Sequence, residues 1–269
     1  MNICFIGGGN MATALIGGLL GRGYPSQQIS VVEINQESRT RLERDFSVRT
    51  HARLEDGVSA SQILVLAVKP QQLREVSLQL AAMLKGQLLI SIAAGIRATD
   101  LARWLGSNNI VRAMPNTPAL IRCGMTGLYA MPAVNPSQRD QAQNILAAVG
   151  ETLWLQDEAM LDAVTAISGS GPAYVFYLIE ALQQAAGQMG FDAEQARRLS
   201  LATFLGACRL AAESAEDVGV LRARVTSKNG TTERALSSLS ENHVADHILQ
   251  AALAAQARSR EMGDELGKD

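Results

Sequence analysis

The chain has 269 residues, enough for one large domain or two modest ones. Hydrophobic residues make up 47% and charged residues 19% of it, which is typical of a globular protein and excludes a disordered or fibrous one. A formal net charge of −2 provides no general attraction to polyphosphate, so we expect no nucleic-acid partner.

The cysteines and the apolar runs limit the possible environments. Cys4, Cys123 and Cys208 are far apart and odd in number, which favours neither a disulfide framework nor a metal site. This cysteine usage suggests a reducing compartment, and we expect a cytoplasmic location. No apolar run approaches the roughly 18 residues that a membrane-spanning helix needs, and MNICFIGGG lacks the features of a signal peptide, so we expect no membrane partner.

The first half of the chain alternates strand-like and helix-like segments. Short aliphatic runs predict strands at residues 3–6, 29–32, 63–68, 88–92, 110–113, 127–130 and 152–155. Helices are predicted at 11–22, 71–84 and 137–149. Several strands are apolar at successive positions, as expected for strands covered on both faces. The pattern predicts an α/β domain over residues 1–155 with a doubly wound, mostly parallel sheet.

The second half, residues 156–269, is predicted to be an all-helical domain. An amphipathic helix begins near Pro172 and ends at Gly190, and alanine-rich helices are expected at 193–215 and 244–266. These helices are unusually apolar. Two explanations remain open, a mutual interface between subunits and a self-contained bundle.

The segment from Phe5 to Ala12 carries the strongest motif. It follows a strand, opens a helix and has the pattern G-x-G-x-x-A. Gly7 permits a tight turn, Gly9 allows the backbone to approach a pyrophosphate, and Ala12 allows helix and strand to pack closely. The helix N-terminus offers N–H groups to the anion. We therefore predict a dinucleotide-binding site.

Glu33 ends the second strand, where a carboxylate usually accepts hydrogen bonds from an adenosine ribose and disfavours a 2′-phosphate. Asn35, Arg39 and Arg41 follow, and they could instead meet a phosphate or simply form a solvated helix face. The sequence leaves the choice between NADH and NADPH open.

Turns after three further strands should face the same ligand, because ligands in open α/β sheets lie beyond the carboxyl ends of the strands. These turns are 67–70, 91–95 and 114–118. Lys69 could act by its charge or be solvated. The turn that contains Asn116 has a composition suited to a wall against a flat ring, although each turn could also be an ordinary connection.

A hydroxyl-rich loop interrupts the helical half. Residues 225–232, VTSKNGTT, precede a helix predicted at 233–239. Helix capping would need one Ser or Thr, whereas four hydroxyl residues gather around a glycine here, which favours a site for a small carboxylate. His243 and His247 are expected on one face of the last helix, at the surface rather than as metal ligands.

Six segments, in order and spacing, resemble the Δ1-pyrroline-5-carboxylate reductase family over essentially the whole chain. They are GGGNMA, AVKP, SIAAG, RAMPNTPA, ISGSGPAYVFY and VTSKNGTTERAL, of which the last three are specific to that family. The resemblance implies a Rossmann domain and a helical dimerisation domain. It also implies that NADPH or NADH reduces 1-pyrroline-5-carboxylate to L-proline, the last step of proline biosynthesis, by hydride transfer to a cyclic iminium. Such enzymes form homodimers with interlocked helical domains, often assembled as pentamers of dimers.

The resemblance also implies site residues. The cofactor would be lined by Gly7, Gly8, Gly9, Asn10, Met11, Ala12, Val68, Lys69, Pro70 and Ala94, to which the strand-end argument adds Glu33 and Asn116. Thr232 would hydrogen-bond the ring nitrogen as the catalytic residue. The substrate carboxylate would be held by Ser227, Gly230 and Thr231, and Glu158 would also reach the substrate.

Two departures from the family pattern leave alternatives. Many relatives have S-P-G-G where this chain has Ser227-Lys228-Asn229-Gly230, although Asn tolerates the left-handed backbone such a turn needs. Glu33 and Ile34 disfavour a strict NADPH preference.

Two other functions are the alternatives. A β-hydroxyacid dehydrogenase would need a lysine of the helical half, where only Lys228 and Lys268 occur. A non-catalytic nicotinamide sensor is the other alternative.

Overall fold

The computed structural model describes residues 1–268, which form two compact units. The first unit is Met1–Ser170 together with the C-terminal segment from Ala254, and the second is Gly171–Leu253. The domain boundary predicted at residue 155 was drawn from the change in sequence pattern, and it stays a prediction.

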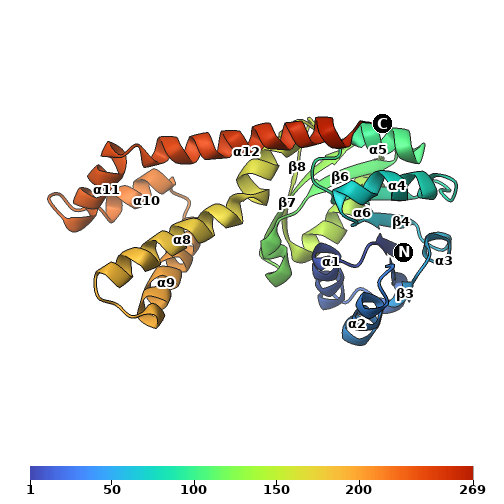
Figure 1. The fold of residues 1–269 in the computed structure, drawn as a ribbon, viewed down its shortest axis with the longest axis horizontal. Coiled ribbons are helices and arrows are strands. Elements are labelled where there is room, and N and C mark those ends of the chain that lie inside the picture. The colour runs from blue at the N-terminus through green and yellow to red at the C-terminus, as the bar shows by residue number, and fades with distance from the viewer. Residues whose placement is uncertain (269) are drawn as a thin grey trace. The chain divides into compact units, whose positions relative to one another are not determined.

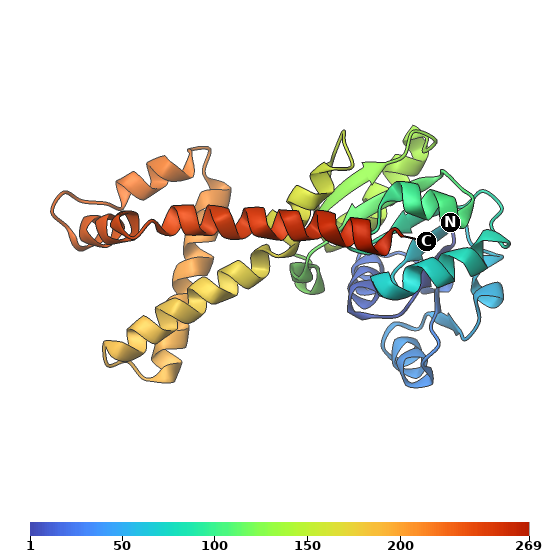
Figure 2. The ribbon, with the colours of Figure 1, turned by 45° about the horizontal axis from the view of Figure 1, so that its top comes forward.

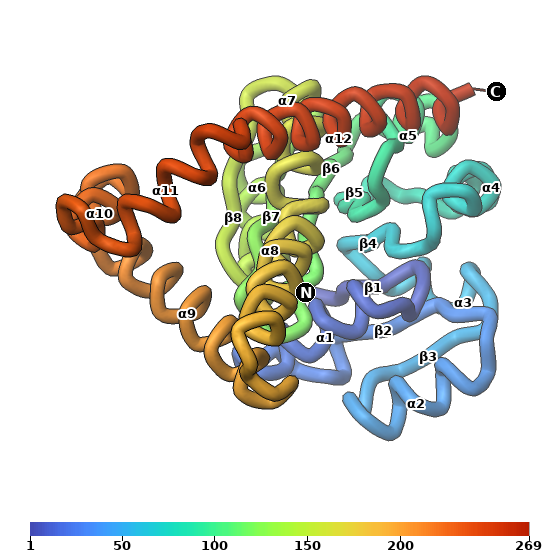
Figure 3. Tube along the Cα trace, turned by 60° about the vertical axis from the view of Figure 1, so that its left-hand side comes forward, coloured from blue at the N-terminus to red at the C-terminus, as the bar shows by residue number. Residues whose placement is uncertain are grey.

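The first unit is built on one sheet of eight strands in the order β3-β2-β1-β4-β5-β6-β7-β8. All neighbours are parallel except β6 and β7, so the predicted mostly parallel, doubly wound sheet is confirmed. The strands are β1 (Ile3–Ile6), β2 (Ile29–Val32), β3 (Arg49–His51), β4 (Ile63–Leu66), β5 (Leu88–Ser91), β6 (Ile110–Met114), β7 (Gly124–Ala130) and β8 (Gly150–Trp154). Figure 3 shows these strands side by side.

Helices cover both faces of this sheet. One buried cluster joins it to α1 (Asn10–Gly21), α2 (Gln36–Phe46) and α6 (Pro136–Leu146). The other joins it to α3 (Leu54–Val58), α4 (Pro70–Ala81) and α5 (Ala98–Leu105). In Figure 1, α4 and α5 lie on one side of the strands, and α1 and α2 lie on the other. Strands β1, β2, β4 and β5 are buried at every position, which explains why they are apolar except for the buried Ser30 and Ser91.

Strand β3 is absent from the predicted elements. It has three residues, Arg49, Thr50 and His51, and it lies at the edge of the sheet, half exposed. A short polar edge strand has no apolar run from which to predict it, and its pairing with β2 becomes visible only in three dimensions.

The second unit is helical throughout, as predicted. It contains α8 (Gly171–Gln188), α9 (Ala193–Glu213), α10 (Val218–Arg224), α11 (Thr231–Glu241) and the first part of α12 (Val244–Leu266). Gly190, with a φ of +97°, lies in the turn after α8. His243 is not on the last helix as predicted, because it precedes α12 in a left-handed conformation (φ +53°) and pairs with Asp246.

This second unit encloses almost no core of its own. Of residues 171–253, only Ala196 and Ser200 are buried. Large apolar side chains are exposed on every helix of the unit, among them Phe176 (66%), Leu205 (55%), Val218 (66%), Leu239 (50%) and Leu249 (54%). A self-contained bundle would bury these side chains, so the exposure favours the other alternative, an interface.

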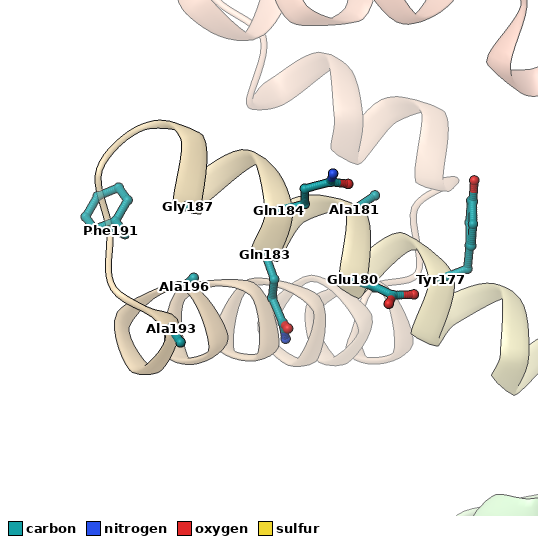
Figure 4. A pocket seen from close by; sticks show the side chains of 9 residues that line it. All are labelled: Tyr177, Glu180, Ala181, Gln183, Gln184, Gly187, Phe191, Ala193 and Ala196. Carbon is teal, nitrogen blue, oxygen red and sulfur yellow. The ribbon is translucent and has the colours of Figure 1, made fainter.

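A hollow between α8 and α9 belongs to this apolar surface. Its volume is about 620 Å³, and its lining comes from α8, the turn after it and the start of α9 (Figure 4). Glu180 is its one ionisable acid, beside Tyr177, Phe191 and several alanines and glutamines. The hollow therefore lacks the converging polar groups expected of a catalytic site.

The last turns of α12 belong to the first unit, where they pack beside α5 (Figure 2). Arg97, just before α5, forms an ion pair with Asp264, and Arg103 of α5 donates a hydrogen bond to the Gly267 carbonyl oxygen. The C-terminal segment thus contacts α5 at both ends of the helix. None of the helices in residues 1–268 has the length and hydrophobicity to cross a membrane.

Candidate active site

The turn between β1 and α1 leaves room for a ligand. Gly7 has a φ of +102°, and a Cβ there would lie 2.9 Å from the carbonyl carbon of Ala67, so only glycine fits. At Gly9, by contrast, a Cβ would have no atom within 4 Å. Gly9 is also the N-cap of α1, and no side chain accepts a hydrogen bond from the backbone N–H groups of the first helical turn. The turn therefore offers open space and N–H groups to an anion.

A cavity of about 660 Å³ lies at this turn and at the carboxyl ends of β1, β2, β3 and β4. Of the residues predicted to bind the cofactor, it brings together Gly7, Gly8, Gly9, Glu33, Val68 and Lys69. Its position beyond the strand ends, with small residues on one wall, suits a dinucleotide. The parallel strands place these turns together because their carboxyl ends meet at one edge of the sheet.

The other predicted cofactor residues lie outside the cavity lining. Asn10, Met11 and Ala12 form the first turn of α1, and Ala12 is buried in the core. Pro70 is the first residue of α4, directly after Lys69 as its N-cap. Their contact with a cofactor stays a prediction.

Some residues that line the cavity were not among those predicted from the sequence. Arg53 and Glu55 come from the segment after β3, and Gln72 and Glu75 come from α4. The first pair was missed because β3 itself was missed. The second pair occupies exposed positions of an amphipathic helix, where polar residues are expected whether or not they line a site.

Ala94 lies in the turn between β5 and α5, which the C-terminal segment covers. Gly95 has a φ of +73°, and a Cβ there would lie 3.2 Å from the Cβ of Met262. The end of α12 therefore packs directly on this turn. Ala94 is held beside the strand ends that line the cavity, although it does not itself line it.

Asn116, in the turn after β6, uses its side-chain amide within the chain. Its Nδ2 donates to the carbonyl oxygen of Ser168 at 3.2 Å and to Ser168 Oγ at 3.1 Å, and its Oδ1 accepts from the Met125 N–H at 2.9 Å. These bonds tie the turn to the π-helical segment Thr165–Gly169. A structural role is therefore evident, and the predicted cofactor contact stays a prediction.

Glu158 is engaged in a buried network of the first unit. Its Oε1 accepts from the Ala98 N–H at 2.6 Å and from Arg112 Nη1 at 2.8 Å. The network borders a cavity of about 480 Å³. At this cavity, Asp162 Oδ1 accepts a hydrogen bond of 2.6 Å from Ser259 Oγ. These contacts support a positioning role at the start of α5, while the predicted contact of Glu158 with substrate stays a prediction.

The hydroxyl-rich loop of the second unit forms a tight turn into α11. Asn229 has a φ of +61°, which confirms that asparagine supplies the left-handed conformation here. Gly230 is the N-cap of α11, and no side chain caps the helix. The Asn229 N–H donates to Glu233 Oε2 at 2.6 Å, so Glu233 fixes the turn from within the helix.

This geometry leaves the start of α11 available to an anion. Thr231 and Thr232 are its first two residues, and Ser227 closes the turn by accepting the Gly230 N–H at 3.0 Å through its carbonyl oxygen. Uncapped N–H groups and nearby hydroxyls are a suitable setting for a small carboxylate. Within residues 1–268, no group of three or more His, Cys, Asp and Glu side chains is arranged to hold a metal ion.

Comparison with known proteins identifies the relatives of this chain. Residues 158–262 match the family model described as pyrroline-5-carboxylate reductase dimerisation, and residues 2–95 match the model described as NADP oxidoreductase coenzyme F420-dependent. The curated pyrroline-5-carboxylate reductase of Pseudomonas aeruginosa is 46% identical over 99% of this chain and 98% of its own length.

Two solved structures extend this likeness to the fold. A pyrroline-5-carboxylate reductase from Coxiella burnetii has a TM-score of 0.92 at 40% identity and covers 97% of this chain and 98% of its own. The pyrroline carboxylate reductase of Plasmodium falciparum, solved with NADP bound, has a TM-score of 0.88 at 29% identity, with 98% of both chains covered.

Proposed function

The chain belongs to the pyrroline-5-carboxylate reductase family, and from this premise we propose that it reduces 1-pyrroline-5-carboxylate to L-proline with NAD(P)H, the last step of proline biosynthesis. The observation that carries the proposal is the likeness to a curated reductase over 99% of the chain. Two features of this chain support it, the cavity at the strand ends and the uncapped, hydroxyl-rich start of α11.

The residues around the first cavity fit a nicotinamide dinucleotide. Gly9 and the N-terminus of α1 would receive the pyrophosphate, since open space and free N–H groups coincide there. Glu33 would meet the adenosine ribose, and Val68 and Lys69 would line the path from the ribose along the strand ends. The bound cofactor supplies the hydride.

The loop before α11 would hold the substrate. Ser227, Gly230 and Thr231 would bind the carboxylate at the helix N-terminus, where the helix dipole favours an anion. Thr232 would accept the N–H of the ring iminium and orient its C=N bond. Because a cyclic imine can arrive already protonated, the chain needs no His–Asp pair as a general acid, and orientation is its main contribution.

A second copy of the chain would cover the apolar helices. The exposed apolar side chains of α8 to α12 would form the buried interface of an obligate homodimer, which resembles a hydrophobic core shared by two chains. We extend the proposal to a pentamer of such dimers. Sedimentation equilibrium distinguishes the two assemblies, because the mass of ten chains is expected and the mass of two would limit the assembly to the dimer. A single-chain mass would contradict both.

The compartment is part of the same proposal. All three cysteines are free, which is typical of a protein kept in the reducing cytoplasm.

Two parallel steady-state assays test the reaction. One follows oxidation of NADH or of NADPH in the presence of pyrroline-5-carboxylate, and the other follows reduction of NAD⁺ or of NADP⁺ in the presence of 3-hydroxyisobutyrate. Oxidation that depends on the imine, with L-proline as product, is expected. Turnover of the hydroxy acid alone would favour the β-hydroxyacid dehydrogenase alternative. Nucleotide binding without turnover of either compound would favour the sensor.

A further inference from the structure

Glu33 lines the cavity where β2 ends, and its carboxylate is held there by two backbone N–H groups. Glu33 Oε2 accepts the N–H of Gly8 at 2.9 Å, and Glu33 Oε1 accepts the N–H of Asn35 at 2.8 Å. Both carboxylate oxygens are thereby fixed at the edge of the cavity, between the glycine turn and the turn into α2. Two backbone N–H donors thus hold the orientation of the Glu33 side chain at this point.

Arg39, the first arginine after Glu33, has partners within the chain. Arg39 Nη1 donates to the carbonyl oxygens of Glu33 and Ile34, at 2.7 and 2.9 Å. Through these two hydrogen bonds, Arg39 holds the turn after β2.

The start of α2 is likewise occupied. The Ser38 N–H donates to the side chain of Asn35 at 2.8 Å, so the N-cap takes up an amide that would otherwise face an anion. Arg53, on the opposite wall, forms an ion pair with Asp56 at 3.2 Å. Ile34, exposed between these groups, contributes no charge.

We propose that Glu33 determines the cofactor specificity of this reductase and that the chain prefers NADH to NADPH. The carboxylate can accept hydrogen bonds from both ribose hydroxyls, whereas a 2′-phosphate would place two negative charges beside it. Arg39 and Arg53 have partners within the chain, and Lys69, the other cation on the described lining, lies at the end of β4, on the far side of β1 from Glu33. The inference rests on the proposed function only in assuming that the cavity binds the nucleotide.

Calorimetric titration with nucleotide fragments tests the inference without the reaction. ADP-ribose should bind at least about tenfold more tightly than 2′-phospho-ADP-ribose, because the fragments differ only at the position that faces Glu33. Equal or reversed affinities would overturn the inference. If ADP-ribose is preferred but the enzyme reduces no imine, the proposed function fails and the specificity assignment stands.

The substitution Glu33→Gln tests the charge itself. It keeps the size of the side chain, so the ratio of kcat/KM for NADPH to that for NADH should rise about tenfold or more. Glu37→Gln is the matched control, since it removes the same charge from an exposed position in the first turn of α2, and its ratio should match the wild-type ratio. Fragment titration of both variants gives the same comparison should Glu33→Gln lose activity. An unchanged ratio of fragment affinities in Glu33→Gln would overturn the proposal.

Discussion

Arg112 of β6 donates a hydrogen bond to Glu158 across 46 positions of the chain, and the oxygen that receives it also accepts the N–H of Ala98. The Arg112 side chain is only 7% exposed and that of Glu158 19%. Glu158 therefore links the centre of the sheet to the first residue of α5, directly after the turn that contains Ala94.

Glu158→Leu should destabilise the protein by about 3 kcal/mol, because a buried ion pair that loses one partner leaves an uncompensated charge. Denaturant unfolding at a fixed chain concentration measures the change. The double variant Arg112→Met/Glu158→Leu should recover much of the loss, since neither charge remains. Glu151→Gln, at an exposed position of β8, is the control and should change the free energy of unfolding little. A double variant less stable than Glu158→Leu would contradict this account.

The glycines of the first turn should separate folding from binding. Gly7→Ala should cost about 1–3 kcal/mol of stability, because alanine is strained at a φ of +102° and meets the backbone of Ala67. Gly9→Ala should fold with normal stability, because nothing lies near its Cβ, yet bind nucleotide about tenfold or more weakly, since the methyl group fills the ligand space. Thermal unfolding and nucleotide titration of each variant provide the two measurements. Normal nucleotide affinity in Gly9→Ala would place the pyrophosphate elsewhere.

Thr232→Ala should lower kcat/KM for the imine at least about tenfold while leaving the Kd for nucleotide nearly unchanged, because only the contact to the ring nitrogen is lost. Thr232→Ser keeps the hydroxyl and should retain most of the activity. Rates measured at saturating cofactor, with nucleotide titration alongside, check the prediction. Wild-type activity in Thr232→Ala would remove Thr232 from the mechanism.

The apolar surface of the second unit should hold the subunits together. Phe176→Glu introduces a charge at a 66% exposed phenylalanine of α8, and desolvating that charge in an interface should weaken association enough to lower the measured mass. Leu78→Glu is the control, because Leu78 is 49% exposed on α4 of the first unit, and its mass should equal that of the wild type. Light scattering of both variants at equal concentration decides the matter, and an unchanged mass for Phe176→Glu would place the interface elsewhere.

Cys4 should make stability fall at alkaline pH. Burial raises the pKa of the Cys4 thiol from 9.0 to about 11, so the unfolded chain releases this proton first as the pH rises. The contribution is complete below pH 9 and is lost as the pH passes 11, amounting to about 2 kcal/mol by then. The free energy of unfolding of Cys4→Ala should therefore decline less between pH 8.5 and 11 than that of the wild type. Parallel declines would refute a buried, protonated thiol.

Much of the first unit could be predicted from the amino-acid sequence. Strands β1 and β2 were predicted with their observed bounds, because strands buried on both faces are short and mostly apolar runs between turns. The glycine motif likewise indicated its own site, since Gly7 is required by local backbone conformation and by its neighbour Ala67. The left-handed Asn229 was foreseeable for the same reason, as a local preference of one residue type.

Features that depend on packing, or on contacts between residues distant in the chain, became visible only in three dimensions. Strand β3 exists because β2 pairs with it, not because Arg49, Thr50 and His51 favour a strand. The roles of Arg39 and Glu158 depend on which carbonyl or guanidinium lies within hydrogen-bond distance, and composition carries no such information. The exposed side chains of α8 and α9 distinguish an interface from a closed bundle, because periodicity shows which face of a helix is apolar but not what covers it.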